Sequence, residues 1–193
     1  LAGPSRALLT GERTALNFIG RLSGIASKAA RYAALTAGRH LTILDTRKTT
    51  PGLRRLEKYA VQAGGCANHR LGLYDMIMLK ENHIRAAGGI TGAVALCRDH
   101  APGIPVEVET TCLEEIEEAL ASGAERIMFD NMDDALIARA VALVAGRAET
   151  EASGNMDEAR IRALAGSGVD FISVGGLTHS VSCLDFSLLF DEA

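Results

Sequence analysis

Cysteine is scarce in this sequence, and the few cysteines present follow no recognisable pattern. They are widely and irregularly spaced, form no Cys-x-x-Cys pair and have no companion histidines at zinc-ligand distance. This spacing argues against both a zinc site and a disulfide framework. We therefore expect buried thiols in a reducing compartment at Cys66, Cys97, Cys112 and Cys183.

The sequence also lacks an excess of charge of one sign and a long apolar run. Its 20 basic and 24 acidic residues give a net charge of −4 at pH 7, so no broad basic surface is expected to attract a nucleic acid or an anionic membrane. We find no run of about 18 apolar residues and no segment that resembles a secretory leader. These absences predict a cytoplasmic protein that binds neither nucleic acid nor membrane.

Glycine-rich nucleotide-binding loops are missing as well, although glycine itself is common. The 20 glycines form neither a G-x-G-x-x-G motif nor a Walker loop. A chain of 193 residues is long enough for one core that needs no disulfides. It starts at Leu1, and Gly3 and Pro4 are typical of a linker. We therefore expect part of the native protein to precede this segment.

Short β-branched runs alternate regularly with amphipathic helices. An apolar helical face follows Thr10, and after it the pattern changes to short apolar runs that are bounded by turn residues. Strands separated by helices predict a parallel sheet with right-handed crossovers, and we favour a barrel-like arrangement over an open doubly wound sheet. The expected strands are 41–46, 75–79, 105–108, 126–129, 148–152 and 171–174.

Polar residues follow every expected strand. Ligands of parallel β/α folds bind at the carboxyl ends of the strands, although any one such residue is more often a helix cap, a surface ion-pair partner or a turn residue. Charges from six strand ends would repel or desolvate one another unless a ligand balanced them, so we expect an anionic substrate held with a metal. The residues are Arg47 and Lys48; Lys80, Glu81 and Asn82; Glu109; Asp130 and Asn131; Ser153, Gly154 and Asn155; and Gly175 and Gly176.

The order of these residue types fits such a ligand. Arginine presents a planar fork that suits a carboxylate, and lysine presents a point charge that suits a phosphate. Acidic residues can hold Mg²⁺ or face a developing cation, and glycine turns offer backbone N–H groups to a phosphate. Three further cationic candidates lie outside the strand ends, and a structural role is equally consistent with His69 and Arg13. The third is Arg70.

The string TRKTTPGLR at 46–54 is too long and too unusual in composition for coincidence. With NHR at 68–70 and MLKENH at 78–83, it closely resembles the quinolinate phosphoribosyltransferase family, also called nicotinate-nucleotide pyrophosphorylase (carboxylating). The resemblance covers nearly the whole chain. It continues through ERTALN at 12–17, VEVE at 106–109, FDN at 129–131, EASG at 151–154 and VGGLTH at 174–179.

This resemblance implies an incomplete, open α/β barrel of the TIM type, with an N-terminal α/β sandwich domain that is largely absent here. Residues 1–9 would be a linker from that domain, 10–183 the catalytic barrel, and 184–193 a segment that packs with the sandwich. The implied reaction transfers phosphoribose from 5-phosphoribosyl 1-diphosphate to quinolinate with Mg²⁺. It gives nicotinate mononucleotide, carbon dioxide and diphosphate in NAD biosynthesis.

The resemblance also implies roles for single residues. Arg13 matches an arginine that is donated by a neighbouring subunit, which predicts a homodimer or a higher oligomer. Lys48, Glu109 and Asp130 match catalytic positions, and Glu109 and Asp130 are the expected Mg²⁺ ligands. The expected quinolinate-binding residues are Arg13, Arg47, His69, Arg70 and Lys80, and the expected phosphoribosyl diphosphate-binding residues are Lys48, Glu109, Asp130, Ser153, Gly154, Asn155, Gly175 and Gly176.

Two other interpretations stay open. One is a relative of the same fold that acts on another aromatic acid, or a paralogue associated with molybdate transport genes. The intact set of Arg47, His69, Arg70 and Lys80 favours a dicarboxylate over that interpretation. The other is a non-catalytic barrel fragment that serves assembly or regulation, and the complete charged set speaks against it.

Overall fold

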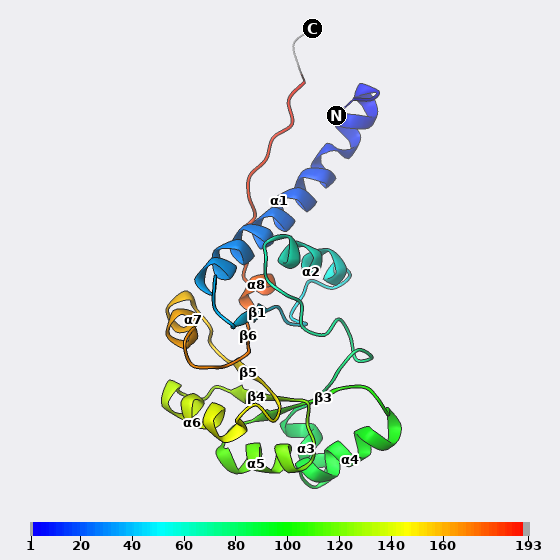
Figure 1. Ribbon diagram of the computed structural model, residues 1–193. Helices are drawn as coiled ribbons and strands as arrows, with labels where there is room; N and C mark the ends of the chain where they lie inside the picture. Colours follow the sequence, from blue (N-terminus) through cyan, green and yellow to red (C-terminus); the bar gives the residue numbers. More distant parts are fainter. Residues whose placement is uncertain (1, 191–193) are drawn as a thin grey trace.

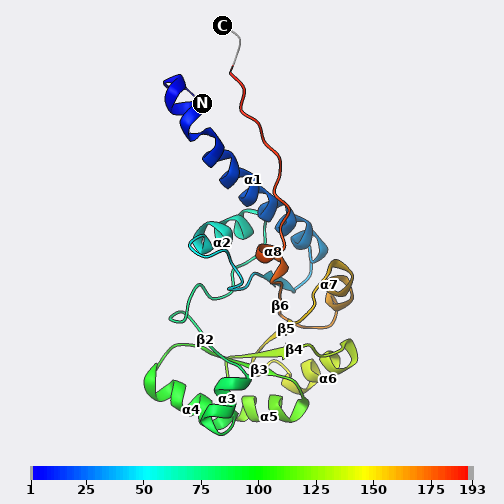
Figure 2. The same ribbon diagram turned by 180° about the vertical axis from the view of Figure 1, so that it is seen from behind.

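Six parallel strands form a single sheet in the computed structural model of this chain, which describes residues 2–190 (Figures 1 and 2). The order along the sheet is β1-β6-β5-β4-β3-β2, so β1 and β2 are its two edges. Among the described residues these two edge strands do not pair with each other, and the isolated bridge of Leu44 with Ala67 joins β1 to the loop before β2. The expected open barrel is therefore present. Its strands are β1 (Thr42–Leu44), β2 (Ile77–Leu79), β3 (Val106–Thr110), β4 (Arg126–Asp130), β5 (Glu149–Ser153) and β6 (Phe171–Ser173).

Helices connect the strands and cover the outer face of the sheet (Figure 1). Parallel neighbours require such crossovers, because the chain must return to the starting edge before the next strand begins. The helices are α1 (Ser5–Leu35), α2 (Arg54–Ala63), α3 (Glu81–Ala87), α4 (Ile90–His100), α5 (Leu113–Ala121), α6 (Asp134–Val144), α7 (Glu158–Leu164) and α8 (Gly176–His179).

Alternate residues of the central strands separate the apolar core from the interior of the barrel. Val106 and Val108 of β3 and Ile127 and Phe129 of β4 belong to the buried apolar cluster. The residue between the two valines, Glu107, is buried but polar. Because successive side chains of a strand point to opposite faces, one face packs on the helices and the other lines the barrel. The polar side chains that line the barrel therefore lie on the same face of the strands as the site at the strand ends.

One boundary differs from the sequence-based expectation. The first helix begins at Ser5, so residues 5–9, which were expected in a linker, are helical. Pro4 precedes the helix with an extended ψ of 128°, a position where proline disrupts no intrahelical hydrogen bond.

The four cysteines differ in burial. All are free thiols, and only Cys66 is buried, whereas Cys183 is exposed. The expectation of four buried thiols was wrong for Cys183, and Cys97 and Cys112 are only partly buried, although Cys97 packs against the apolar core.

The segment after α8 runs back along α1 without regular secondary structure (Figure 2). The N–H of Leu184 donates to the carbonyl of Gly20 at 3.0 Å. A Cβ on Gly24 would lie 2.2 Å from the Ser182 carbonyl oxygen, so glycine allows this close approach. No helix among the described residues is both long and apolar enough to span a bilayer.

Candidate functional site

A pocket of about 1070 Å³ opens at the carboxyl ends of the strands. Of the substrate-binding residues expected from the family resemblance, only Arg13 does not line it, and of the polar strand-end residues only Glu81 and Asn82 do not. Arg13 lies on the exposed surface of α1. The others lining the pocket are Arg47, Lys48, His69, Arg70, Lys80, Glu109, Asp130, Ser153, Gly154, Asn155, Gly175 and Gly176.

Hydrogen bonds from three elements fix the loop that follows β1. Arg21 of α1 donates to the Thr50 hydroxyl at 2.7 Å and to Glu57 at 2.7 Å, and Glu57 in turn accepts the N–H of Thr50 at 3.1 Å. The Thr178 hydroxyl donates to the carbonyl of Lys48 at 2.8 Å. The TRKTT segment therefore presents Arg47 and Lys48 from a rigid backbone.

Arg54 is a pocket residue that the sequence did not single out, although it ends the TRKTTPGLR string. Its guanidinium donates to the carbonyls of Arg47 (3.3 Å) and Leu71 (3.2 Å), and to the Thr49 hydroxyl (3.0 Å). It ties the loop after β1 to the loop before β2. The sequence shows an arginine at this position, but only the fold shows that the loop after β1 and the loop before β2 are neighbours.

Cations and acids meet at the centre of the pocket. Lys80, at the end of β2, pairs with Glu109, at the end of β3, at 2.6 Å. Arg47 and Arg70 have no carboxylate partner within the described residues. Burial, and the nearby charge of Arg47, lower the pKa of the Arg70 guanidinium. An anion placed beside these two arginines would relieve that crowding.

Glycine and left-handed residues shape the opposite wall. Gly154 has φ +100°, and a Cβ there would lie 2.2 Å from Oδ1 of Asn131, which itself has φ 53°. The side-chain amide of Asn131 donates to Asp130 at 2.9 Å. A Cβ on Gly175 would lie 3.1 Å from Cδ of Lys48. These glycines leave space for their neighbours' side chains and bring bare backbone to the pocket wall.

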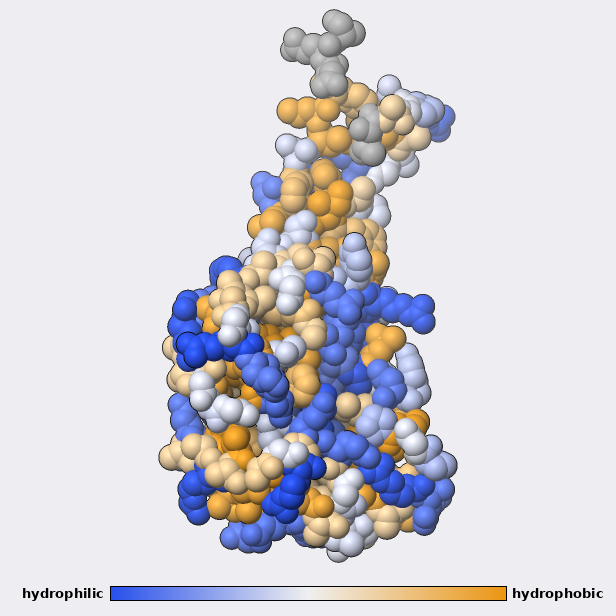
Figure 3. All heavy atoms as spheres, viewed as in Figure 1, coloured by the Kyte–Doolittle hydropathy of each residue, from blue (hydrophilic) through white to orange (hydrophobic). Residues whose placement is uncertain are grey.

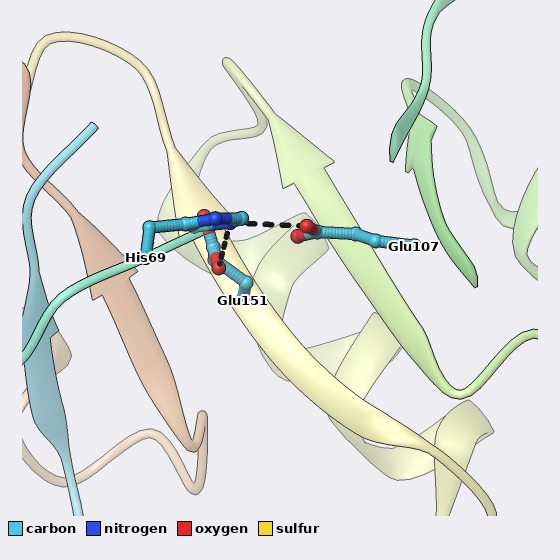
Figure 4. A group of neighbouring side chains, drawn as sticks. All are labelled: His69, Glu107 and Glu151. Carbon is cyan, nitrogen blue, oxygen red and sulfur yellow. Dashed lines mark ion pairs between the residues drawn. The ribbon is translucent and has the colours of Figure 1, made fainter. Parts of the chain in front are cut away.

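Beneath the pocket, His69 lies between two buried carboxylates (Figure 4). Its Nε2 is 3.0 Å from Glu107 of β3 and 3.2 Å from Glu151 of β5, and both glutamates are 0% exposed. Arg126 of β4 reaches Glu151 at 3.4 Å and Glu149 at 2.8 Å. Sequence reasoning missed both buried glutamates. Strand alternation offered the signal, since Glu107 lies two residues before Glu109 on the same face.

Burial and the two neighbouring carboxylates have opposite effects on the pKa of His69. Burial lowers the pKa of His69, but the two carboxylates outweigh burial and raise that pKa to about 9. The N–H of Arg70 points at Nδ1 of the ring at 2.7 Å and favours an unprotonated Nδ1. In both the neutral and the charged ring, Nε2 carries a proton on the side of the two carboxylates.

The two buried glutamates differ in the direction of their pKa shifts. Burial and the charge of Glu151 raise the pKa of Glu107. His69 and Arg126 lower the pKa of Glu151 against the effect of burial.

Within the described residues, His69, Glu107 and Glu151 are the one group of three side chains close enough to share a metal ion. The proton on Nε2 argues against this use, because a ligating imidazole nitrogen must be unprotonated. Arg126 also supplies positive charge there already. The expected Mg²⁺ ligands, Glu109 and Asp130, lie instead at adjacent strand ends in the pocket. Two carboxylates suit Mg²⁺, which usually keeps several waters and binds substrate phosphates.

The chain is similar to known proteins over almost its entire length. Residues 25–189 match the family model described as quinolinate phosphoribosyl transferase, C-terminal domain. A probable nicotinate-nucleotide pyrophosphorylase (carboxylating) of Bacillus subtilis strain 168 is 49% identical over 191 residues, and the match covers 97% of this chain and 65% of that protein. The chloroplastic nicotinate-nucleotide pyrophosphorylase (carboxylating) of Arabidopsis thaliana is 46% identical over 210 residues, with 99% and 60% covered.

Solved structures show the same arrangement of elements. The crystal structure of NadC from Streptococcus pyogenes superimposes with a TM-score of 0.91 at 50% identity, and the match covers 96% of this chain and 65% of that one. The nicotinate-nucleotide pyrophosphorylase from Francisella tularensis gives a TM-score of 0.90 at 46% identity, with 93% and 64% covered. The chain thus spans less than two thirds of the length of these relatives.

Proposed function

Because this chain belongs to the quinolinate phosphoribosyltransferase family, we propose that it is the catalytic barrel of an enzyme that makes nicotinate mononucleotide. The enzyme transfers phosphoribose from 5-phosphoribosyl 1-diphosphate to quinolinate and releases carbon dioxide and diphosphate, a step of NAD biosynthesis. The proposal places it among the pentosyltransferases.

One observation carries the proposal: Arg47 and Arg70 line the pocket without a carboxylate partner among the described side chains, opposite a wall of glycines and acids. Paired arginines suit a ligand with two carboxylates, because each guanidinium can bind one carboxylate through two parallel hydrogen bonds. Lys80 adds a third cation once a ligand competes with Glu109 for it. A monocarboxylate would leave part of this charge unbalanced.

Phosphoribosyl diphosphate would bind on the other wall. Lys48 lies against Gly175, where its ammonium can reach a phosphate, and the backbone around Gly154 and Gly175 offers N–H groups to the 5-phosphate. Glu109 and Asp130 would hold Mg²⁺, which when bound would neutralise the diphosphate as it leaves. The same carboxylates would stabilise the positive charge that develops on the ribosyl carbon.

The chemistry requires no covalent intermediate on the protein. The pyridine nitrogen forms a bond to C1 of the ribose as the bond to diphosphate breaks. The nitrogen is then cationic, so it stabilises the electron pair left on the neighbouring ring carbon when carbon dioxide departs. That carbon finally takes up a proton. The cysteines need no role, and the pocket residues bind and orient the two substrates.

We also propose that the active form is a homodimer or a higher oligomer. Arg13 lies on α1, is exposed and does not line the pocket of its own chain. An arginine at this place can serve quinolinate binding only in the site of a neighbouring subunit. Exposed apolar side chains along the same helix, among them Phe18 and Ile19, support an interface there.

Turnover by the full-length protein tests the proposed reaction. We expect quinolinate, phosphoribosyl diphosphate and Mg²⁺ to yield nicotinate mononucleotide and carbon dioxide in equal amounts, and we expect no product with nicotinate in place of quinolinate. Formation of the nucleotide from nicotinate, or from another aromatic acid in preference to quinolinate, would contradict the proposal. Release of carbon dioxide that is not matched by nucleotide would contradict it as well.

A further inference from the structure

We infer that Lys58 is a positioning residue, which holds the peptide between His69 and Arg70 and so fixes how Arg70 lies relative to Arg47. The inference rests on the proposed function, which assigns both arginines to the aromatic acid. Lys58 lies on α2, and its side chain is only 4% exposed. It does not line the pocket at the strand ends, so its effect on the acid is indirect.

A buried ion pair holds the backbone of His69 on both sides. Nζ of Lys58 donates to Oδ1 of Asp45 at 2.5 Å and to the carbonyl of His69 at 2.9 Å. The same oxygen of Asp45 accepts the N–H of His69 at 2.8 Å. The side chain of Asp45 is 0% exposed, so water does not compete for these bonds. One ion pair therefore fixes the N–H and the carbonyl of the same residue.

The carbonyl of His69 leads directly into Arg70. It belongs to the same planar peptide as the Arg70 N–H, so the bond from Lys58 sets the orientation of this peptide. The side chains of His69 and Arg70 both line the pocket, and Nη1 of Arg70 donates to the Met76 carbonyl at 3.2 Å. Rotation of the peptide would move the start of the Arg70 side chain. Displacements of about 1 Å in a binding group are enough to change rates or affinities severely.

Asp45 connects this peptide to the segment that carries Arg47. It follows β1 directly and lies two residues before Arg47. Backbone hydrogen bonds join the two segments at Ala67, whose N–H donates to Ile43 at 2.9 Å and whose carbonyl accepts the N–H of Asp45 at 3.1 Å. After Ala67 the side chain of Asp45 continues the connection and accepts the amide of Asn68 at 2.7 Å. The segments of the two arginines are therefore joined through this carboxylate.

A second cation of α2 bridges the same two segments. Arg54 lies four residues before Lys58, so the two side chains lie on one face of the helix. Arg54 donates to the carbonyl of Arg47 at 3.3 Å and to the carbonyl of Leu71 at 3.2 Å. It joins the ends of the two loops, whereas Lys58 contacts the peptide that leads into Arg70. Helix α2 therefore spaces the two segments at two successive points.

Burial makes the ion pair of Asp45 and Lys58 a weak source of stability. Burial raises the pKa of the Asp45 carboxyl and lowers the pKa of the Lys58 ammonium, although the contact between the two groups opposes both shifts. Removal of two charges from water costs free energy that their attraction often does not exceed. Loss of both charges should therefore cost little stability, whereas loss of Lys58 alone leaves a buried carboxylate without its cation.

Steady-state kinetics of the full-length protein separates positioning from stability. In Lys58→Met we expect the KM for quinolinate to rise by about tenfold or more, with the KM for phosphoribosyl diphosphate within about twofold of wild type. The double variant Asp45→Asn/Lys58→Met removes both charges and keeps an acceptor for the His69 N–H. We expect it to melt at a higher temperature than Lys58→Met and yet to retain the raised KM for quinolinate, because the His69 carbonyl still lacks its donor.

Val61→Ala is the matched control for a loss of stability. Val61 lies on the same helix, is 0% exposed and belongs to the apolar core. Its truncation should lower the melting temperature, because buried apolar contacts are lost. Both KM values should nevertheless stay within about twofold of wild type, because the ion pair is intact.

A wild-type KM for quinolinate in the double variant, equal increases for both substrates, or the same increase in Val61→Ala would overturn the inference. Should Lys58→Met fail to fold, the double variant decides alone. Lack of quinolinate turnover by the wild-type protein would refute the proposed function and this inference with it. Normal turnover by wild type, together with an unchanged KM in the double variant, would refute the inference alone.

Discussion

At the scale of single residues, some charges of the site are paired within the chain, and several cations of the described pocket have no acidic partner. Lys80 pairs with Glu109, and Arg126 pairs with Glu149 and Glu151. Arg47, Arg54 and Arg70 have no carboxylate partner among the described residues of the pocket, and the guanidinium of Arg54 is already bound by two backbone carbonyls and the Thr49 hydroxyl. Charges that converge without an internal partner favour an external one, which supports the proposal that Arg47 and Arg70 bind the substrate.

Arg70→Ala should remove most of the affinity for quinolinate. A charge-assisted, bidentate contact to a carboxylate is lost, which costs roughly 2 to 4 kcal/mol of binding free energy. Isothermal titration of quinolinate into the full-length variant measures this loss. Arg55→Ala is the matched control, because Arg55 is exposed and lines a separate, smaller surface pocket. An affinity in the Arg70→Ala variant equal to that of the control would refute the assignment.

The lowered pKa of Asp75 predicts that the stability of the fold depends on pH. Although partial burial opposes the shift, the N–H groups of Leu71 (2.5 Å) and Gly72 (3.0 Å) lower the pKa of its carboxyl from 3.8. A depressed pKa stabilises the fold above pH 3.8, and this contribution is lost as the pH falls through the lower folded value. Asp75→Asn should therefore lower the melting temperature at pH 7, by an amount that shrinks towards pH 3 and below. A difference that grows on acidification would contradict this account.

The sequence predicted the exposed members of the site better than the buried ones. Lys48, Glu109 and Asp130 were found because they follow apolar runs directly, and all three line the pocket. Glu107 and Glu151 lie inside the apolar runs that predict strands. A charged residue within such a run is usually assumed to face the helices or to belong to an edge strand. Only the curved geometry of the sheet shows that they meet His69 from two strands. The roles assigned to the pocket residues stay predictions.

At the scale of elements, hydrophobic periodicity was sufficient to locate every strand, and all six predicted strands are confirmed. Their ends differ from the predicted ones by at most two residues, because apolar runs and ladder hydrogen bonds do not end at the same residue. The start of α1 was missed by five residues, since Gly3 and Pro4 were read as a linker that extends to Leu9. Pro4 instead lies directly before the helix, a position that proline favours.

Gly154 is the turn residue on which the phosphate-binding wall depends most. Its φ of +100° is rare for other residues, and an added Cβ would lie 2.2 Å from Oδ1 of Asn131. Gly154→Ala should destabilise the fold by about 1 to 3 kcal/mol and weaken binding of phosphoribosyl diphosphate. Thermal unfolding and titration with that ligand measure both effects. Gly166→Ala, where an added Cβ meets no atom within 4 Å, is the control, and equal behaviour of the two variants would refute the prediction.

At the scale of the whole molecule, the outer half of α1 and the segment after α8 form an apolar surface away from the pocket (Figure 3). A patch of this kind usually marks an interface. The family assignment made from TRKTTPGLR is confirmed by the matching model and relatives, whereas the division into linker, barrel and packing segment stays a prediction. The surface comprises Leu9, Phe18, Ile19, Leu184, Phe186, Leu189 and Phe190.

Mixing two inactive variants tests whether Arg13 acts across an interface. In a mixed dimer of Arg13→Ala and Arg70→Ala subunits, the site of the Arg13→Ala subunit has its own Arg70 and receives Arg13 from its partner. Random exchange of subunits should therefore restore activity at about a quarter of the sites. Each variant alone should show almost none. No recovery after verified exchange would mean that Arg13 does not serve the neighbouring site.

The proposed oligomer could not be predicted from the residues of one chain in physical terms, because a subunit interface depends on groups outside that chain. Arg13 reads as an exposed helix cation until a second subunit is considered. Glu109 is paired with Lys80 and reads as one half of an ion pair until substrate and Mg²⁺ compete for the two side chains. The family resemblance supplied these roles, and single-residue patterns did not.

The central claim is that the cationic half of this pocket recognises an aromatic dicarboxylate. Calorimetric titration of the full-length protein with quinolinate, compared with nicotinate under the same conditions, tests it most directly. We expect quinolinate to bind at least about tenfold more tightly, because only quinolinate supplies two carboxylates for Arg47 and Arg70. Equal affinities, or tighter binding of nicotinate, would show that the paired arginines do not select a dicarboxylate and would contradict the account.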